Sequence, residues 1–131
     1  MKAYIIILSL LAALLTSNVL RAEDDATNTL INVARACGDL GVSANLKTDQ
    51  KVVPDKAHVI FVQCLPQWQR VAIATVEDQA HDKISNFRNR KDAQTLYRNI
   101  DATLIALESD EEARLRDAMR AAAMTPAPKQ R

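Results

Sequence analysis

Apolar positions recur with a helical period along most of the chain. Between Thr27 and Cys37 they fall three or four residues apart, which places them on one face of a helix. Gly38 follows directly and predicts the end of that helix, because glycine is common just after helix C-termini. Residues 38–54 hold both glycines and a proline, so we expect a long loop there, with at most one helical turn around residues 43–46.

The most apolar stretch beyond the N-terminus is HVIFVQCLPQW, residues 58–68. Its consecutive apolar residues 59–62 fit a buried helix or a buried strand. We favour a helix capped by Asp55, because no second stretch of the chain offers a strand to pair with it. Pro66 lacks an amide hydrogen, so it must kink this helix or begin a new one.

Two further apolar stripes predict the second half of the fold. The first predicts the longest helix, from Pro66 to about Arg88, and comprises Trp68, Val71 or Ala72, Thr75 or Val76, Ala80, Ile84 and Phe87. Asp92 can cap the next helix, whose stripe is Leu96, Ile100, Leu104 and Leu107. Ser109 and Glu112 have the spacing of a capping box, which predicts a further helix beginning at the residue after Ser109.

The composition supports an all-α fold. The chain has two glycines and 4% aromatic residues, whereas β-rich domains need regular turn residues and many β-branched and aromatic side chains. We therefore expect a small bundle of about four helices with one disulfide.

The N-terminus predicts export. Residues 1–22 have the three parts of a secretory signal peptide: a positive charge at Lys2, an apolar run over residues 3–15, and a polar break before cleavage after Ala22. Leu20 is larger than the residue usually found three positions before the cleaved bond, so an uncleaved anchor is the alternative. Cleavage would leave no membrane span in the chain.

The remaining sequence predicts one domain. We expect a single helical domain over residues 23–124 and a disordered tail over residues 125–131, which holds two prolines and no apolar pattern. The formal net charge of the whole chain is +1. Such a balance argues against a nucleic-acid-binding protein, which is normally clearly basic.

Two cysteines in an exported chain predict one disulfide, between Cys37 and Cys64. The bond would close the long connection between the first two helices. In the chain-entropy model such a closure stabilises a domain by about 3 kcal/mol. We therefore interpret the apolar stretch as a junction, at which Cys64 fastens one helix to another and Pro66 changes the direction of the chain.

Chemistry-bearing patterns are few. Residues 77–82, EDQAHD, place carboxylates four residues from His81 and from each other, a spacing that suits a metal ion or an acid–base pair and is also common on solvated helix faces. His58 is a distant further ligand, and its spacing to the cysteines matches no compact metal motif. We therefore expect an exposed polar face, with no metal site, catalytic residue or cofactor.

The densest basic patch comprises Arg88, Arg90 and Lys91. Such a cluster can dock the acidic surface of a partner, and it can equally complement the dipole at a helix C-terminus. We take these three residues as the candidate docking site.

These features favour a secreted or periplasmic binding protein rather than an enzyme. We expect it to act by contact with another protein, as inhibitors, immunity proteins and adaptors do, through the loop 39–53 and the basic patch. One alternative is a carrier of a small apolar ligand, with residues 59–62, Trp68 and Leu104 lining its cavity. Another is a stress or chaperone-like exported protein kept soluble by its many charges.

Overall fold

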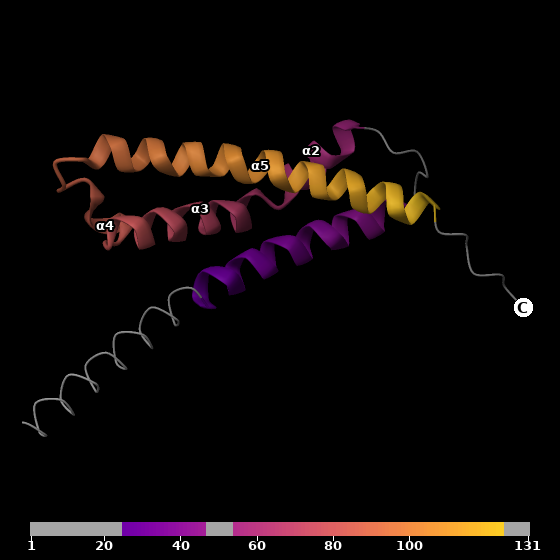
Figure 1. Cartoon of the computed structure of the whole chain (residues 1–131), viewed down its shortest axis with the longest axis horizontal. Helices are drawn as coiled ribbons and strands as arrows, with labels where there is room; N and C mark the ends of the chain where they lie inside the picture. The colour runs from indigo at the N-terminus through magenta and orange to yellow at the C-terminus, as the bar shows by residue number, and fades with distance from the viewer. Residues whose placement is uncertain (1–24, 47–53, 125–131) are drawn as a thin grey trace, which may run out of the picture.

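The computed structural model describes residues 25–46 and 54–124, and this part of the chain forms helices joined by short turns, with no strand (Figure 1). The predicted all-α bundle with a disulfide is therefore confirmed. The helices are a first one over residues 25–46, then α2 (Pro54–Gln63), α3 (Leu65–Ala80), α4 (Ile84–Phe87) and α5 (Ala93–Met124). The predicted signal peptide (1–22) and tail (125–131) lie outside the described residues.

α2 and α3 together form one kinked arm that runs antiparallel to α5, and the helix over residues 25–46 lies along both (Figure 1). Specific contacts fix the register of this first helix against the arm. Thr27 Oγ1 donates to Asp78 Oδ2 over 2.8 Å at one end, and Cys37 is bonded to Cys64 further along. The first helix therefore runs antiparallel to the arm and parallel to α5.

The first helix does not end at Gly38, as the sequence predicted, but continues to residue 46. Both glycines lie inside it, and neither has a positive φ. A Cβ at Gly41 would lie 2.7 Å from Ile60 Cγ2, and one at Gly38 would lie 2.8 Å from Glu111 Oε1. The glycines serve close approach of helices rather than termination, which explains why the loop prediction was wrong for residues 38–46.

The apolar stretch forms a helix, as favoured, although this helix begins at Pro54 and so includes Asp55 instead of being capped by it. The helix breaks at Cys64. The Cys64 amide donates to the carbonyls of Ile60 and Phe61 over 3.2 and 3.0 Å, and the chain then begins α3 with Pro66 in its first turn. A missing amide hydrogen has no consequence there, because the first amides of a helix have no intrahelical acceptor. Pro66 thus begins a new helix.

α3 is shorter than predicted, ending at Ala80 instead of about Arg88. His81 adopts a left-handed conformation with φ of 51°, and the amide of Asp82 donates back to the Glu77 carbonyl over 3.2 Å. These features terminate the helix. The apolar stripe continues to Phe87 because α4 resumes a helical conformation after the turn.

α5 is one continuous helix of 32 residues and is the longest described. The predicted break at Ser109 does not occur. Ser109 is exposed in the middle of the helix, and Glu112 contacts His58 instead of capping. The apolar stripe runs past the capping-box motif to Leu115 and Met119, both buried, so packing along the whole arm keeps the helix intact.

Among the described residues, the core consists of three clusters arranged along the bundle, and side chains of α5 take part in each. The central cluster surrounds the disulfide and comprises Ala34, Phe61, Cys64, Trp68 and Val71, with Leu104 and Leu107 packed against it. The second, where α2 meets the C-terminal half of α5, comprises Val42, Ala57, Ile60, Leu115 and Met119. The third, at the end of the molecule that holds α4, comprises Val76, Phe87 and Leu96.

Candidate functional site

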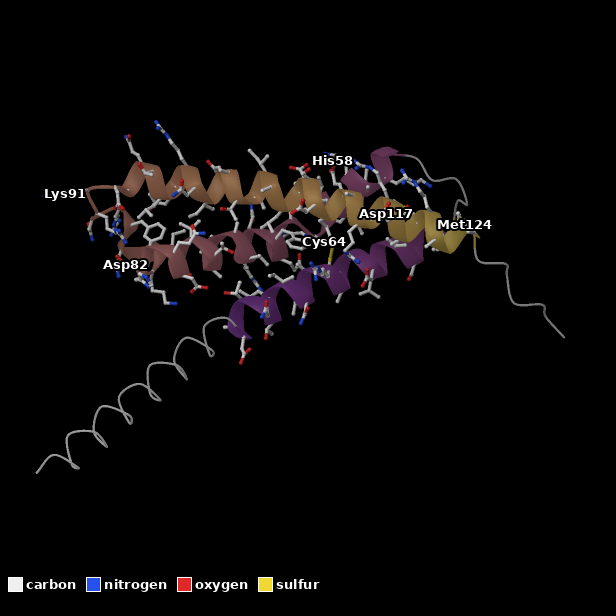
Figure 2. All side chains as sticks on the ribbon, in the orientation of Figure 1. His58, Cys64, Asp82, Lys91, Asp117 and Met124 are labelled. Atoms are coloured by element: carbon white, nitrogen blue, oxygen red, sulfur yellow. A yellow bond between two sulfur atoms is a disulfide. The ribbon has the colours of Figure 1, made fainter. Side chains whose placement is uncertain are left out.

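The predicted disulfide between Cys37 and Cys64 is present, with the two Cα atoms 5.9 Å apart (Figure 2). It fastens the first helix to the junction between α2 and α3. Phe61 and Trp68, on either side of this junction, stack with ring centroids 6.2 Å apart. The sequence interpretation of this segment as a fastened junction is confirmed.

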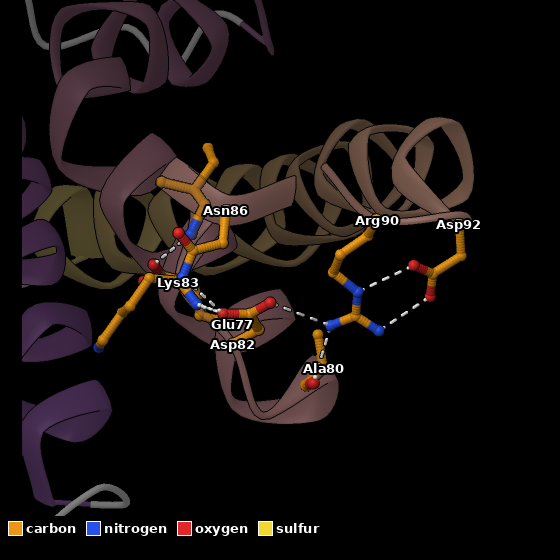
Figure 3. A network of polar contacts seen from close by, with 8 residues as sticks. Glu77, Ala80, Asp82, Lys83, Asn86, Arg90 and Asp92 are labelled. Atoms are coloured by element: carbon orange, nitrogen blue, oxygen red, sulfur yellow. Dashed lines mark hydrogen bonds and ion pairs between the residues drawn. The ribbon is translucent and has the colours of Figure 1, made fainter. Parts of the chain in front are cut away.

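The predicted docking residues Arg88, Arg90 and Lys91 lie in the turn between α4 and α5, and Arg90 has an internal role (Figure 3). Its Nε and Nη2 atoms donate to the two carboxylate oxygens of Asp92 over 2.9 and 3.0 Å. Its Nη1 donates to the Ala80 carbonyl over 3.0 Å and lies 3.7 Å from Asp82 Oδ2. Arg90 therefore joins the end of α3 to the start of α5.

Arg88 and Lys91 flank this contact and are exposed. Within the described part of the chain, neither side chain forms an ion pair or a hydrogen bond. Tyr97, one turn into α5, packs the edge of its ring against Phe87 with centroids 6.0 Å apart and remains 42% exposed. We call Arg88, Lys91 and Tyr97 the tip surface.

The acidic stretch 77–82 does not form the pairs that its spacing allows. Asp78 accepts the hydroxyl hydrogen of Thr27, and Glu77 accepts the amide hydrogen of Ile84 over 2.8 Å. Asp82 accepts hydrogen bonds from the Asn86 side chain and from the Lys83 amide, which lower the pKa of its carboxyl group, with a smaller contribution from nearby Arg90. These carboxylates brace the turn after α3 and line a shallow cavity of about 270 Å³.

A histidine–glutamate cluster joins α2 to α5. His58 Nδ1 lies 2.7 Å from Glu112 Oε1 and 3.2 Å from Glu108 Oε1. The hydrogen bond with Glu112 is the largest cause that raises the His58 pKa, and Glu108 adds to it, while partial desolvation opposes them. Sequence reasoning missed this cluster. The interval of four between the two glutamates was a visible signal, but their approach to His58 depends on how two distant helices pack.

A second ion pair crosses from α5 to the first helix. Glu111 is 3% exposed, and its carboxylate accepts two hydrogen bonds from Arg114, over 2.8 Å from Nε and 2.7 Å from Nη2. Arg114 Nη1 also donates to Asp39 over 2.8 Å. The hydrogen bonds with Glu111, then those with Asp39, raise the Arg114 pKa further above its ordinary value. The guanidinium satisfies a buried carboxylate beside Gly38, so this pair is structural.

A cavity of about 290 Å³ lies between the first helix and α5, with Trp68 in its lining. Its apolar lining includes Ile31 and Leu107, and its polar lining includes Arg35 and Glu111. The carrier alternative placed residues 59–62 around such a cavity, whereas none of these four residues lines this one. Val59 and Val62 are half-exposed, while Ile60 and Phe61 belong to the packed core.

Comparison of the chain with protein-family models, curated proteins and solved structures finds no match. None of the helices in the described ranges is both long enough and apolar enough to cross a bilayer.

Proposed function

We propose that this chain is a small helical binding protein that docks an acidic segment of another protein on its tip surface. The observation that carries the proposal is that the three residues of the basic patch differ in their contacts. Arg90 forms four polar contacts within the fold, whereas Arg88 and Lys91 direct their charges outward beside an anchored aromatic ring. Arginine and tyrosine are also the residue types most enriched among the strongest contributors to protein interfaces.

Preorganisation supports this role. A turn of loosely held residues would lose conformational freedom on binding, and that loss weakens affinity. Here the bidentate contact between Arg90 and Asp92 fixes the turn in advance, and the Ala80 carbonyl fixes it against α3. Arg90 is therefore a positioning residue, and Arg88 and Lys91 are the contact residues.

The test is site-specific photo-crosslinking in the cell that produces the protein, with the full chain expressed so that it reaches its natural location. A photoreactive amino acid at Asn89, exposed in the turn that holds Arg88 and Lys91, is compared with one at Gln79, exposed on α3. We expect a discrete protein adduct from position 89 alone, with the crosslinked peptide of the partner rich in Asp and Glu. No adduct, or an equal adduct from position 79, would contradict the proposal.

Charge-reversal variants provide a second test with the same crosslinking experiment. The pair Arg88→Glu and Lys91→Glu is expected to abolish the adduct because two attractive charges become repulsive. The matched pair Arg70→Glu and Arg120→Glu changes net charge equally at exposed positions away from the tip, and it should leave the adduct intact. An adduct that survives reversal at the tip would refute electrostatic docking there.

A carrier function is the second candidate, supported by one observation. The indole N–H of Trp68 is buried and has no hydrogen-bond acceptor within the described chain, and Trp68 lines the 290 Å³ cavity. A small amphipathic carboxylic acid would suit the apolar lining and the exposed Arg35. Because Trp68 is the chain's one tryptophan, octanoate should shift its fluorescence if it enters the cavity, and Ile31→Phe should abolish the shift. An unchanged spectrum at saturating octanoate would exclude this carrier chemistry.

A further inference from the structure

The His58, Glu108 and Glu112 cluster is the one group among the described residues whose histidine and carboxylate ligand atoms converge closely enough to hold an ion. One ligand atom from each residue lies within 4.8 Å of the other two. The two glutamates are one turn apart on α5, and His58, labelled in Figure 2, contacts them from α2. The cluster lies at a different place from the tip surface, so it is independent of the proposed docking function.

The chemistry of the three groups suits zinc. Imidazole nitrogen and carboxylate oxygen both bind Zn²⁺ at about 2.0–2.2 Å, and a tetrahedral centre therefore holds neighbouring ligand atoms about 3.3 Å apart. The separations of 2.7 Å and 3.2 Å between His58 Nδ1 and the two carboxylate oxygens are close to that value. Small side-chain movements would open the space for an ion.

Arg116 contacts Glu112 through the carboxylate oxygen that does not face His58. Its Nη2 lies 3.3 Å from Glu112 Oε2, whereas the other oxygen of Glu112, Oε1, faces His58. A hydrogen-bond partner on the far oxygen of a ligating carboxylate fixes its orientation, as outer-shell groups do at metal centres. Arg116 therefore holds Glu112 with Oε1 directed at the site.

We propose that His58, Glu108 and Glu112 form a binding site for a divalent transition-metal ion of the zinc type. The side chain of His58 is 57% exposed, so the fourth coordination position faces solvent and takes water or a ligand from outside. A bound ion would link α2 directly to α5. Three protein ligands with an open position leave room for water or an outside ligand on the ion, in contrast to closed four-ligand structural sites.

Protons compete with the ion for this site. A histidine nitrogen binds a metal ion only in its deprotonated form, so binding displaces any proton held there. The affinity for zinc should therefore rise with pH.

The test is isothermal titration of the oxidised, untagged chain with zinc chloride, in one mildly acidic and one neutral buffer. We expect one ion per chain, with at least about tenfold weaker binding for His58→Ala and Glu108→Gln. His81→Ala is the matched control, because His81 is the other histidine and lies in the turn after α3. Its affinity should equal that of the unaltered chain.

Histidine NMR gives an independent readout of the same site. Zinc should shift the His58 imidazole resonances and leave those of His81 unchanged. Absence of zinc binding, or binding that His58→Ala retains, would overturn the proposal and leave the cluster as an ion pair alone. Circular dichroism of each variant separates lost ligation from lost folding. Calcium, which prefers sites made of oxygen ligands, should bind far more weakly than zinc.

Discussion

At the scale of single residues, one residue type has different roles at different positions, and sequence alone does not separate them. The sequence around Gly38 predicts a helix end, yet Gly38 faces Glu111 inside the helix, and Gly41 faces Ile60. The disulfide, by contrast, was predictable because the chain holds two cysteines and therefore one possible internal pairing. Sequence signals from neighbouring residues therefore mispredict structure at positions where a contact with another helix determines which residue fits.

Gly41→Ala is expected to destabilise the fold. In an isolated helix this substitution would stabilise by about 1 kcal/mol. Here the new Cβ would lie 2.7 Å from the branched side chain of Ile60, which is fully buried and cannot move aside. Overpacking of this kind costs about 1–3 kcal/mol. Urea unfolding measures the change, and a stabilised variant would show that the helices are not so close.

The same experiment has an internal control. In an Ile60→Ala background the contacting atoms are absent, so adding Gly41→Ala should cost nothing further and regain part of its helix propensity. If the two substitutions are additive instead, the loss at Gly41 has a cause other than contact with Ile60.

His58 should make stability depend on pH. Its folded-state pKa is raised above the ordinary 6.5, chiefly by the hydrogen bond with Glu112 and further by Glu108. The charged contact therefore stabilises fully below about pH 6.5, and its contribution is lost as the pH rises through the folded-state pKa. Urea unfolding in chelator-treated buffer should show this loss, and His58→Gln should remove it while His81→Gln does not. An equal slope in His58→Gln would assign the dependence to another group.

At the scale of elements, the apolar period predicted where helices exist better than it predicted where they end. The stripe from Leu96 to Leu107 belongs to α5 as expected, but the capping-box motif at Ser109 and Glu112 gave a false boundary. A capping-box motif can begin a helix, but it does not require one to begin. Here buried residues recur across the motif, so packing of α5 against the first helix and α2 favours a continuous helix.

Ser109→Ala distinguishes the two interpretations of that motif. In the middle of a continuous exposed helix face, the change should stabilise by about 0.5 kcal/mol through helix propensity. If Ser109 capped a new helix, the same change would destabilise by about 1 kcal/mol. Thermal unfolding measures the sign, with Ser43→Ala, exposed in the first helix, as the matched control. A destabilised Ser109→Ala would indicate a break in α5.

At the scale of the whole molecule, buried contacts are distributed unevenly. The first helix contributes side chains to the central cluster and to the cluster at the C-terminal half of α5, and the disulfide lies in the central one. The cluster around Phe87 is formed by the end of α3, by α4 and by the start of α5, and it is closed by the polar contacts of Arg90. The disulfide and fold class followed from sequence, but this asymmetry depends on helix register, which no local pattern contains.

Hydrogen exchange should report the asymmetry directly. Amides of residues 84–100 are expected to exchange faster than those of residues 57–72, because fewer buried contacts resist their opening. Arg90→Ala should accelerate exchange at the tip by at least about tenfold, since it removes charged hydrogen bonds, and leave residues 57–72 unchanged. Arg70→Ala is the control. Uniform acceleration throughout the protein would mean that the tip and the core open together.

The order of the helices along the chain, with α5 after the other described helices, also bears on how the protein folds during synthesis. A ribosome releases the N-terminal residues first, yet every core cluster requires side chains from α5: Leu96, Leu104, Leu107, Leu115 or Met119. Until α5 has been synthesised, the earlier helices lack the partner that completes their packing. A ribosome stalled before residue 104 should therefore display an incompletely folded polypeptide that proteases cut readily.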